Sequence, residues 1–175
     1  MIKEILVSPV GAYHDHSRMP TSEALVYYLQ VVMAYAFLTT VVGLLTGTAL
    51  FSSGAAQTPP YAVVLYFFGL LLGSCAWALF LGITVHLTSR ALGGSGSMKE
   101  TLSACLLSFT PLMVTGWIPL IGSYIADIWS LSLFVIGIRE VHALSTRRAV
   151  LAVVLPLALL FTLLVLTFIY LIPTL

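Results

Sequence analysis

Residues 139–172 read REVHALSTRR, a basic segment, followed by AVLAVVLPLALLFTLLVLTFIYLI, which carries no charge. A helix needs about 20 predominantly apolar residues to cross the hydrocarbon core of a membrane, and the uncharged part of this stretch reaches that length. Arg147 and Arg148 lie at its start and Tyr170 near its end, where basic and aromatic anchors flank membrane spans. The stretch therefore predicts a membrane helix that begins at a positively charged surface.

The rest of the chain has the same character. Of its 175 residues, 60% are hydrophobic and 7% are charged, whereas about a quarter of the residues of a soluble domain are charged. Four further apolar runs precede residue 139, and five spans leave no room for a separate soluble domain. We therefore predict an all-α integral membrane five-helix bundle, with spans at about 25–51, 61–88, 99–116, 120–138 and 147–172.

The seven Lys and Arg residues give the orientation of these spans. All of them fall in three of the six segments outside the apolar runs: Lys3 and Arg18, Arg90 and Lys99, and Arg139, Arg147 and Arg148. Basic residues are enriched in cytoplasmic loops. This alternation predicts a multi-pass protein of the cell's inner membrane, with the N-terminus in the cytoplasm and the C-terminus outside.

Two parts of the chain follow from this topology. Residues 1–22 form a cytoplasmic N-terminal segment, in which Ile2, Ile5 and Leu6 could give a short interfacial helix its apolar face. Residues 23–175 form the membrane domain. The electrostatic partner of the basic face is the anionic leaflet of the lipid bilayer rather than nucleic acid.

Helix packing within the membrane is indicated by small residues and by a proline. Pairs of small residues at four-residue spacing allow close approach of helix backbones in lipid. They predict packing inside the bundle, or else a homo-oligomer interface. The third span is the shortest and richest in Ser and Thr, and Pro111 should kink it. The small pairs are Gly43 and Gly47, Gly69 and Gly73, and Ala78 and Gly82.

Asp127 is the only charged residue away from the ends of the predicted spans, and it is the intramembrane functional candidate. A carboxylate in hydrocarbon is costly and should face protein or water. No Lys or Arg lies at its depth, so a salt bridge is not available. Its function would be a proton or cation site, and the alternative is a hydrogen-bonded packing group. Partners at the same depth are hydroxyls, those of Thr46, Tyr66, Thr110, Thr115 and Thr167.

The four histidines lie on the predicted cytoplasmic side. His14 and His16 flank Asp15 in the N-terminal segment, His86 is near the inner end of the second span, and His142 follows the fourth. Imidazole and carboxylate groups can bind a divalent transition metal. The sequence therefore offers these five residues as candidate metal ligands, with solvated or headgroup-facing side chains as the alternative. No other cofactor is indicated.

Enzyme signatures are missing from the sequence. It contains neither a His-Glu-x-x-His helix nor a Gly-x-Ser-x-Gly elbow, and no pair of carboxylates lies within the spans. The glycine-rich stretch 93–97 follows a membrane span and lacks the Lys-Ser/Thr pair of a nucleotide-binding loop. We therefore expect a protein that is not an enzyme.

Several stretches together resemble the Yip1-domain family of small five-span membrane proteins. They are Ile5-Leu-Val-Ser-Pro9, His86-Leu-Thr-Ser-Arg-Ala-Leu-Gly-Gly-Ser-Gly-Ser97, Ser108-Phe-Thr-Pro111 and Gly137-Ile-Arg-Glu-Val-His142. Eukaryotic members of that family are Golgi and vesicle proteins that interact with Rab GTPases. The chain lacks their Asp-Leu-Tyr-Gly-Pro motif and resembles the compact prokaryotic type. The resemblance implies a five-span membrane domain.

Three hypotheses about function remain open from the sequence. The first is a membrane-organising or interaction module, which binds a second copy through its small-residue helix faces or binds another protein. The second is an ion or proton channel or transporter that uses Asp127. The third is a divalent-metal-binding protein that uses the histidines at the cytoplasmic face.

Overall fold

The computed structural model describes residues 20–47, 58–119 and 122–171, and these residues form helices and connecting turns without a strand. The predicted all-α class is thereby confirmed. The predicted interfacial helix in residues 1–22 falls almost entirely outside the described residues. The helices are α3 (Thr21–Thr46), α4 (Pro60–Ala91), α5 (Met98–Ser108), α6 (Thr110–Thr115), α7 (Gly122–His142) and α8 (Thr146–Leu171).

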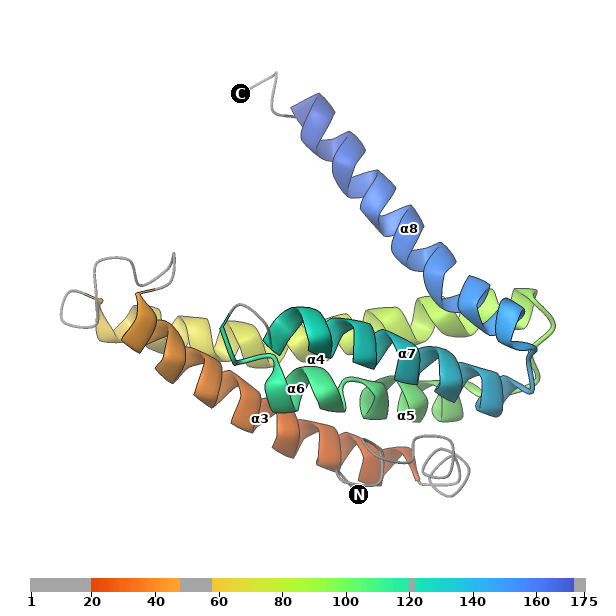
Figure 1. The fold of residues 1–175 in the computed structure, drawn as a ribbon, viewed down its shortest axis with the longest axis horizontal. Helices are drawn as coiled ribbons and strands as arrows, with labels where there is room; N and C mark the ends of the chain where they lie inside the picture. Colours follow the sequence, from red (N-terminus) through yellow and green to blue (C-terminus); the bar gives the residue numbers. More distant parts are fainter. Residues whose placement is uncertain (1–19, 48–57, 120–121, 172–175) are drawn as a thin grey trace.

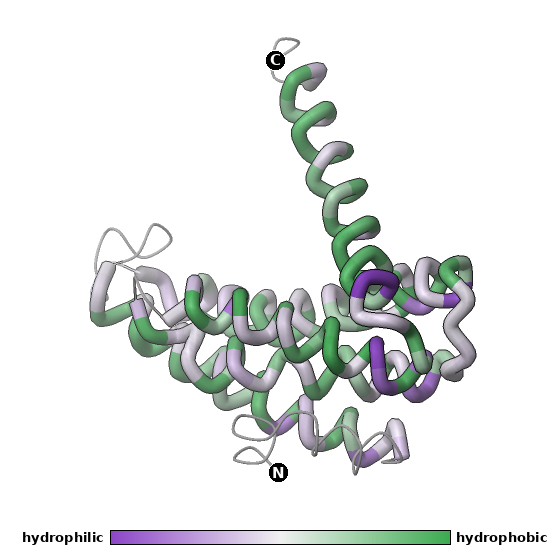
Figure 2. The backbone as a smooth tube through the Cα atoms, turned by 45° about the vertical axis from the view of Figure 1, so that its right-hand side comes forward, coloured by the Kyte–Doolittle hydropathy of each residue, from purple (hydrophilic) through white to green (hydrophobic). Residues whose placement is uncertain are grey.

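Helices α3 to α7 lie side by side along the long axis of the molecule (Figure 1). The chain reverses direction from each long helix to the next. The start of α3, the α4–α5 turn and the α7–α8 turn consequently lie at the same end of the bundle (Figure 1). Hydrophilic residues gather near that end, whereas α8 is hydrophobic along most of its length (Figure 2). We call this the basic end, because the ends of the helices that meet there carry Arg90, Lys99, Arg139, Arg147 and Arg148.

Three helices of the described part are long and apolar enough to cross a membrane: α3, α4 and, up to Tyr170, α8. The predicted third and fourth spans correspond to α5 with α6 and to α7, which do not meet that standard. The physical reason is visible in their sequences. The third span is broken and rich in hydroxyl side chains, and α7 carries Asp127, Arg139 and Glu140.

Helix α5 occupies the centre of the bundle. It packs against α3, α4 and α7, and its residues Thr101 and Ser103 to Ser108 are all buried. A helix surrounded by other helices does not face lipid, so it tolerates polar side chains whose hydroxyls are satisfied. The hydroxyls of Ser103 and Ser108 donate to the carbonyls of Lys99 and Cys105 in the same helix.

The kink predicted at Pro111 is a complete break, with Phe109 between α5 and α6. Proline has no N–H and leaves the carbonyl four residues before it without its helical donor. Here that carbonyl belongs to Leu107, and the Thr110 hydroxyl donates to it at 2.7 Å. The Tyr27 hydroxyl of α3 lies 3.1 Å from the Thr110 hydroxyl, so the broken helix is fastened to α3.

Helix α8 has a proline in its interior, Pro156, and the same compensation occurs there. The carbonyl left without its donor belongs to Ala152, and the Thr88 hydroxyl of α4 donates to it at 2.6 Å. Up to this point α8 packs into the bundle, with Ala149, Ala152 and Val153 fully buried. The C-terminal part of α8 departs from the other helices at a steep angle (Figure 1).

The three pairs of small residues have three different roles. Ala78 and Gly82 pack inside the bundle, since Ala78 is fully buried and a Cβ at Gly82 would lie 2.6 Å from the Leu102 side chain. Gly47 ends α3 in the left-handed conformation, with φ 62°, as glycine after a helix commonly does. Gly69 and Gly73 are exposed, and a Cβ at either would meet nothing within 4 Å.

Candidate functional site

A glycine turn connects α4 to α5 at the basic end. Gly93 has φ +90°, which favours glycine, and the Gly94 amide donates to the Ser89 carbonyl. Ser97 then caps α5. Its hydroxyl accepts from the Glu100 amide, and the Glu100 carboxylate accepts from the Ser97 amide at 2.7 Å. The turn is thus fixed at both sides by local hydrogen bonds.

Three side chains from three helices meet beside this turn. Nδ1 of His86 on α4 lies 2.9 Å from the hydroxyl oxygen of Thr101 on α5. Nε2 of His142, the last residue of α7, lies 2.8 Å from the same oxygen. The two imidazole rings are 5.5 Å apart between centroids. We call this group the His86–Thr101–His142 cluster.

The hydrogen-bond roles in the cluster follow from the single proton of the Thr101 hydroxyl. An acceptor for that proton lies in the same helix, the Ser97 carbonyl at 2.9 Å. The hydroxyl oxygen then accepts from both imidazoles, from Nδ1–H of His86 and from Nε2–H of His142. A neutral His142 is left with an unprotonated Nδ1.

Nδ1 of His142 is buried and has no hydrogen-bond partner among the described residues. It packs instead against the glycine turn. A Cβ at Gly94 would lie 2.7 Å from this nitrogen, and one at Gly96 would lie 3.1 Å from it. The Ser95 amide donates to the His142 carbonyl at 3.2 Å. The cluster and the turn together fasten the ends of α4, α5 and α7.

The chemistry available to the cluster is limited by burial. A hydroxyl between two imidazoles could in principle be a nucleophile activated by a base. However, Thr101 is 0% exposed and His142 is 1% exposed, so a substrate cannot reach the hydroxyl in this conformation. The geometry favours a structural connection that is sensitive to protonation.

The pH dependence of this connection can be predicted from His142, which lies beyond the predicted membrane segment 120–138. Burial, with His86 and Arg90 nearby, lowers the pKa of His142 from 6.5 to about 4, and Glu100 opposes this shift. Between these two pH values the unfolded chain binds a proton that the folded protein does not bind. Stability therefore falls as the pH falls through this window.

We expect the free energy of unfolding to decrease by up to about 3 kcal/mol between pH 7 and pH 4 on account of His142. Thermal unfolding of the purified protein in detergent, measured across this range, tests the prediction. His142→Gln should be less stable at pH 7 but should show a shallower dependence on pH. An equally steep dependence in that variant would assign the effect to other groups.

The predicted metal ligands are only partly brought together. His86 and His142 are neighbours, whereas His14, Asp15 and His16 lie outside the described residues. No group of three or more His, Cys, Asp or Glu side chains in the described part is arranged to hold a metal ion. The facing nitrogens of the pair already bind Thr101. The described part therefore contains a histidine pair rather than a metal centre.

Asp127 lies on α7 at the edge of a cavity of about 140 Å³, which Ser108 and Ser130 also line. Its side chain is exposed and forms no hydrogen bond within the described part of the chain. The threonines named as possible partners at its depth donate elsewhere: the hydroxyls of Thr46, Thr110, Thr115 and Thr167 donate to carbonyls of their own helices. Depth along a helix does not determine which face a hydroxyl occupies.

Sequence reasoning missed Thr101 and Thr88, which hold the cluster and the start of α8. Thr88 could have been suspected from the sequence. The carbonyl four residues before the internal Pro156 loses its helical donor and needs a donor from another helix. Thr101 carried no such signal, since its partners are 15 and 41 residues away.

The family to which the chain belongs is decided by comparison with known families. The Yip1 domain model matches residues 3–167. The chain belongs to the Yip1 domain family. No curated protein and no solved structure matches it. The resemblance seen in the short stretches of sequence is therefore confirmed, and the cluster and glycine turn of this Yip1 domain lie within the matched region.

Family and fold agree on the class of protein. This Yip1 domain is a membrane protein, with three described helices that are long and apolar enough to cross a bilayer. Its best-formed polar group, the His86–Thr101–His142 cluster, is buried at the basic end. Large apolar side chains are exposed along α3, along α4 and along α8 beyond Pro156.

Proposed function

We propose that this Yip1 domain is a non-enzymatic interaction module of the inner membrane, which associates with a second copy of itself through one face of α4. The observation that carries the proposal is the uncovered pair Gly69 and Gly73. A Cβ at either position would meet nothing within 4 Å, whereas Gly82 on the same helix is filled by Leu102.

The position of this pair supports association between copies rather than packing within one. Gly69, Gly73 and Ala76 follow one another at four and three residues and share one face of α4. All three are exposed. In lipid, helices associate through van der Waals packing, and small residues let their backbones approach closely. We call Gly69, Gly73 and Ala76 the small-residue face.

The proposal includes five spans, with the basic end in the cytoplasm and the C-terminus outside. The part of α7 up to Ile138 has 17 residues, within the range of about 17–25 residues that cross the hydrocarbon core, and Arg139 and His142 lie beyond it. α5 and α6 together run from residue 98 to 115 and are covered by neighbouring helices. The alternating course of the chain and the single basic end support this topology.

Single cysteines test the topology in intact cells, after Cys75 and Cys105 have been replaced by alanine. We expect Ser53→Cys and Leu175→Cys to react with a membrane-impermeant maleimide added outside. Ser95→Cys in the glycine turn should react only after the membrane is permeabilised. Labelling of Ser95→Cys from outside would reverse the orientation, and protection of both other positions would contradict five spans.

Bulky substitution of the small-residue face tests the association. Gly69→Ile and Gly73→Ile should weaken self-association about tenfold or more, because the β-branched side chain separates the two backbones. Energy transfer between labelled copies in phosphatidylcholine vesicles measures the change. Leu72→Ile is the matched control, since Leu72 is exposed on the same helix and lies beside this face.

The outcome of this experiment is clear in both directions. Energy transfer that persists in both glycine variants would exclude the small-residue face as the interface. Equal loss in Leu72→Ile would show that the effect does not depend on the close approach of backbones.

A further inference from the structure

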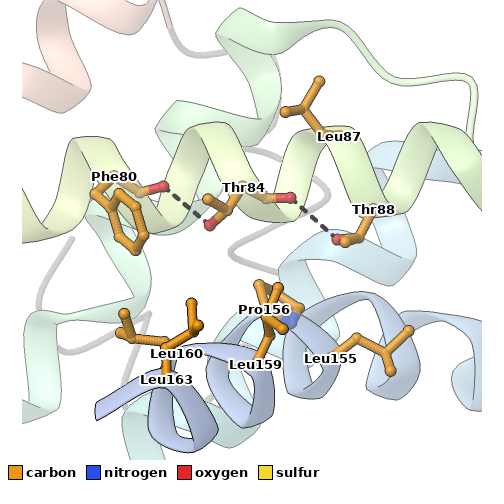
Figure 3. A pocket seen from close by; sticks show the side chains of 9 residues that line it. All are labelled: Phe80, Thr84, Leu87, Thr88, Leu155, Pro156, Leu159, Leu160 and Leu163. Carbon is orange, nitrogen blue, oxygen red and sulfur yellow. Dashed lines mark hydrogen bonds between the residues drawn. The ribbon is translucent and has the colours of Figure 1, made fainter. Parts of the chain in front are cut away.

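A groove of about 450 Å³ lies between α4 and α8, where the two helices diverge. It is closed at the basic end by the hydrogen bond from Thr88 to the Ala152 carbonyl. Figure 3 shows side chains of both helices facing it, with Phe80 and Thr84 on one wall and Leu159 and Leu163 on the other.

The groove presents an apolar surface throughout. The side chains from α8 are leucines and Pro156. The two threonines of α4 offer it no free donor, since the Thr84 hydroxyl donates to the Phe80 carbonyl and that of Thr88 to Ala152. In water such a surface would be unfavourable, and within a bilayer it fits a hydrocarbon chain.

Positive charge lies immediately beyond the closed end of the groove. Arg148 precedes Leu155 by seven residues and Leu159 by eleven, so the three share one face of α8. The Arg90 guanidinium donates to the Gly94 carbonyl at 3.1 Å, and Nη1 of Arg148 lies 3.7 Å from the position of a Cβ at Gly93. Both guanidinium groups therefore border the glycine turn.

Neither arginine is neutralised within the described part of the chain. The ion pair between described residues is that of Arg139 with Glu140, and the groove is lined by no Asp or Glu. Two guanidinium groups at the headgroup level, above an apolar groove, are complementary to a phosphate that carries an acyl chain.

We propose that the groove between α4 and α8 binds a phospholipid with a net negative headgroup, its acyl chain along Thr84 and Leu159 and its phosphate on Arg90 and Arg148. A zwitterionic lipid fits less well, because its cationic amine would lie beside the two arginines. The groove and the small-residue face use different residues on the same side of α4, because Phe80 follows Ala76 by four residues and the groove lies nearer the basic end.

Competitive lipid binding to the full chain tests this site. Purified protein is mixed with equal amounts of dioleoylphosphatidylglycerol and dioleoylphosphatidylcholine, and the retained lipids are measured by native mass spectrometry. We expect preferential retention of phosphatidylglycerol. Arg90→Gln with Arg148→Gln should reduce that preference by about tenfold or more, because each basic residue near the membrane surface adds to the attraction of an anionic lipid.

The matched control is Lys99→Gln with Arg139→Gln, which removes two cations from the same end but away from the groove. It should keep the preference for phosphatidylglycerol. Leu159→Trp should fill the groove and reduce retention of both lipids while thermal unfolding shows a folded protein. Equal retention of both lipids by the unchanged chain would overturn the site, as would equal loss in the control pair. Loss of self-association in Leu159→Trp with unchanged lipid retention would also overturn it, by assigning the groove to a second copy.

Discussion

Gly94→Ala is expected to lower the free energy of unfolding by about 2–3 kcal/mol, the cost of overpacking a closely packed site. The added Cβ would lie 2.7 Å from Nδ1 of His142 and 2.8 Å from the Ser89 carbonyl oxygen. The first atom belongs to a ring without room to move, and the second is backbone. The glycine turn must therefore shift away from α7, which separates the ends of α4 and α7.

Thermal unfolding in detergent measures this effect, and Gly73→Ala is its control. Both variants add one methyl group, but at Gly73 it meets nothing within 4 Å. That control should be neutral or slightly stabilising in detergent that holds the protein as a monomer, where the small-residue face has no partner, since alanine favours the helix over glycine by about 0.5–1 kcal/mol. Similar unfolding temperatures for the two variants would contradict the close contact of the turn with His142.

Thr110→Val is expected to cost about 1–3 kcal/mol, because it removes a donor to the Leu107 carbonyl and the partner that the buried Tyr27 hydroxyl has within the described part of the chain. Valine keeps the shape of threonine, so the loss reports hydrogen bonding rather than packing. Guanidinium or thermal unfolding of the purified protein gives the magnitude.

Two further variants make this result specific. Thr162→Val removes a hydroxyl that donates within its own exposed helix to Ala158, and it should be nearly neutral. Adding Tyr27→Phe to Thr110→Val removes the unpaired hydroxyl and should recover part of the stability. Without recovery, the hydrogen bond between Tyr27 and Thr110 would not explain the cost.

The positions of the helices could be predicted because apolar runs and charged segments alternate along the chain. The predicted segment 61–88 is α4 at Pro60–Ala91, and 147–172 is α8 at Thr146–Leu171. The first helix begins earlier than predicted, at Thr21, because its polar first turn precedes the apolar run. Pro111 also gave a correct signal, since the physical cost of an internal proline is local.

Which face of a helix meets which neighbour could not be predicted. Equal spacing made Gly69 with Gly73 and Ala78 with Gly82 look alike, yet only the second pair is covered by α5. For the same reason, the threonines named as possible partners of Asp127 could be placed at its depth but not on its side of the bundle, and they donate to carbonyls of their own helices. The spacing of residues shows which of them share a face of a helix. It does not show which neighbour that face meets, because the rotation of each helix depends on side-chain packing across the whole bundle.

The sequence predicted two residues of the candidate site but not the hydrogen bonds that connect them. His86 and His142 were both expected at one end of the bundle, and they meet there at a ring separation of 5.5 Å. A metal site was one hypothesis, suggested by residue type alone. In the described part of the chain the hydroxyl of Thr101 lies between the two rings, and nothing in the sequence distinguished this threonine from the others.

Association through the small-residue face is the central claim, and disulfide cross-linking in native membranes tests it most directly. Cysteine is placed at Gly73 in a chain whose Cys75 and Cys105 are replaced by alanine. A second chain carries cysteine at Ile128, which is also exposed but lies on α7. Mild oxidation should give a covalent dimer with Gly73→Cys and little with Ile128→Cys. No dimer with Gly73→Cys, or equal dimer with both, would contradict the claim.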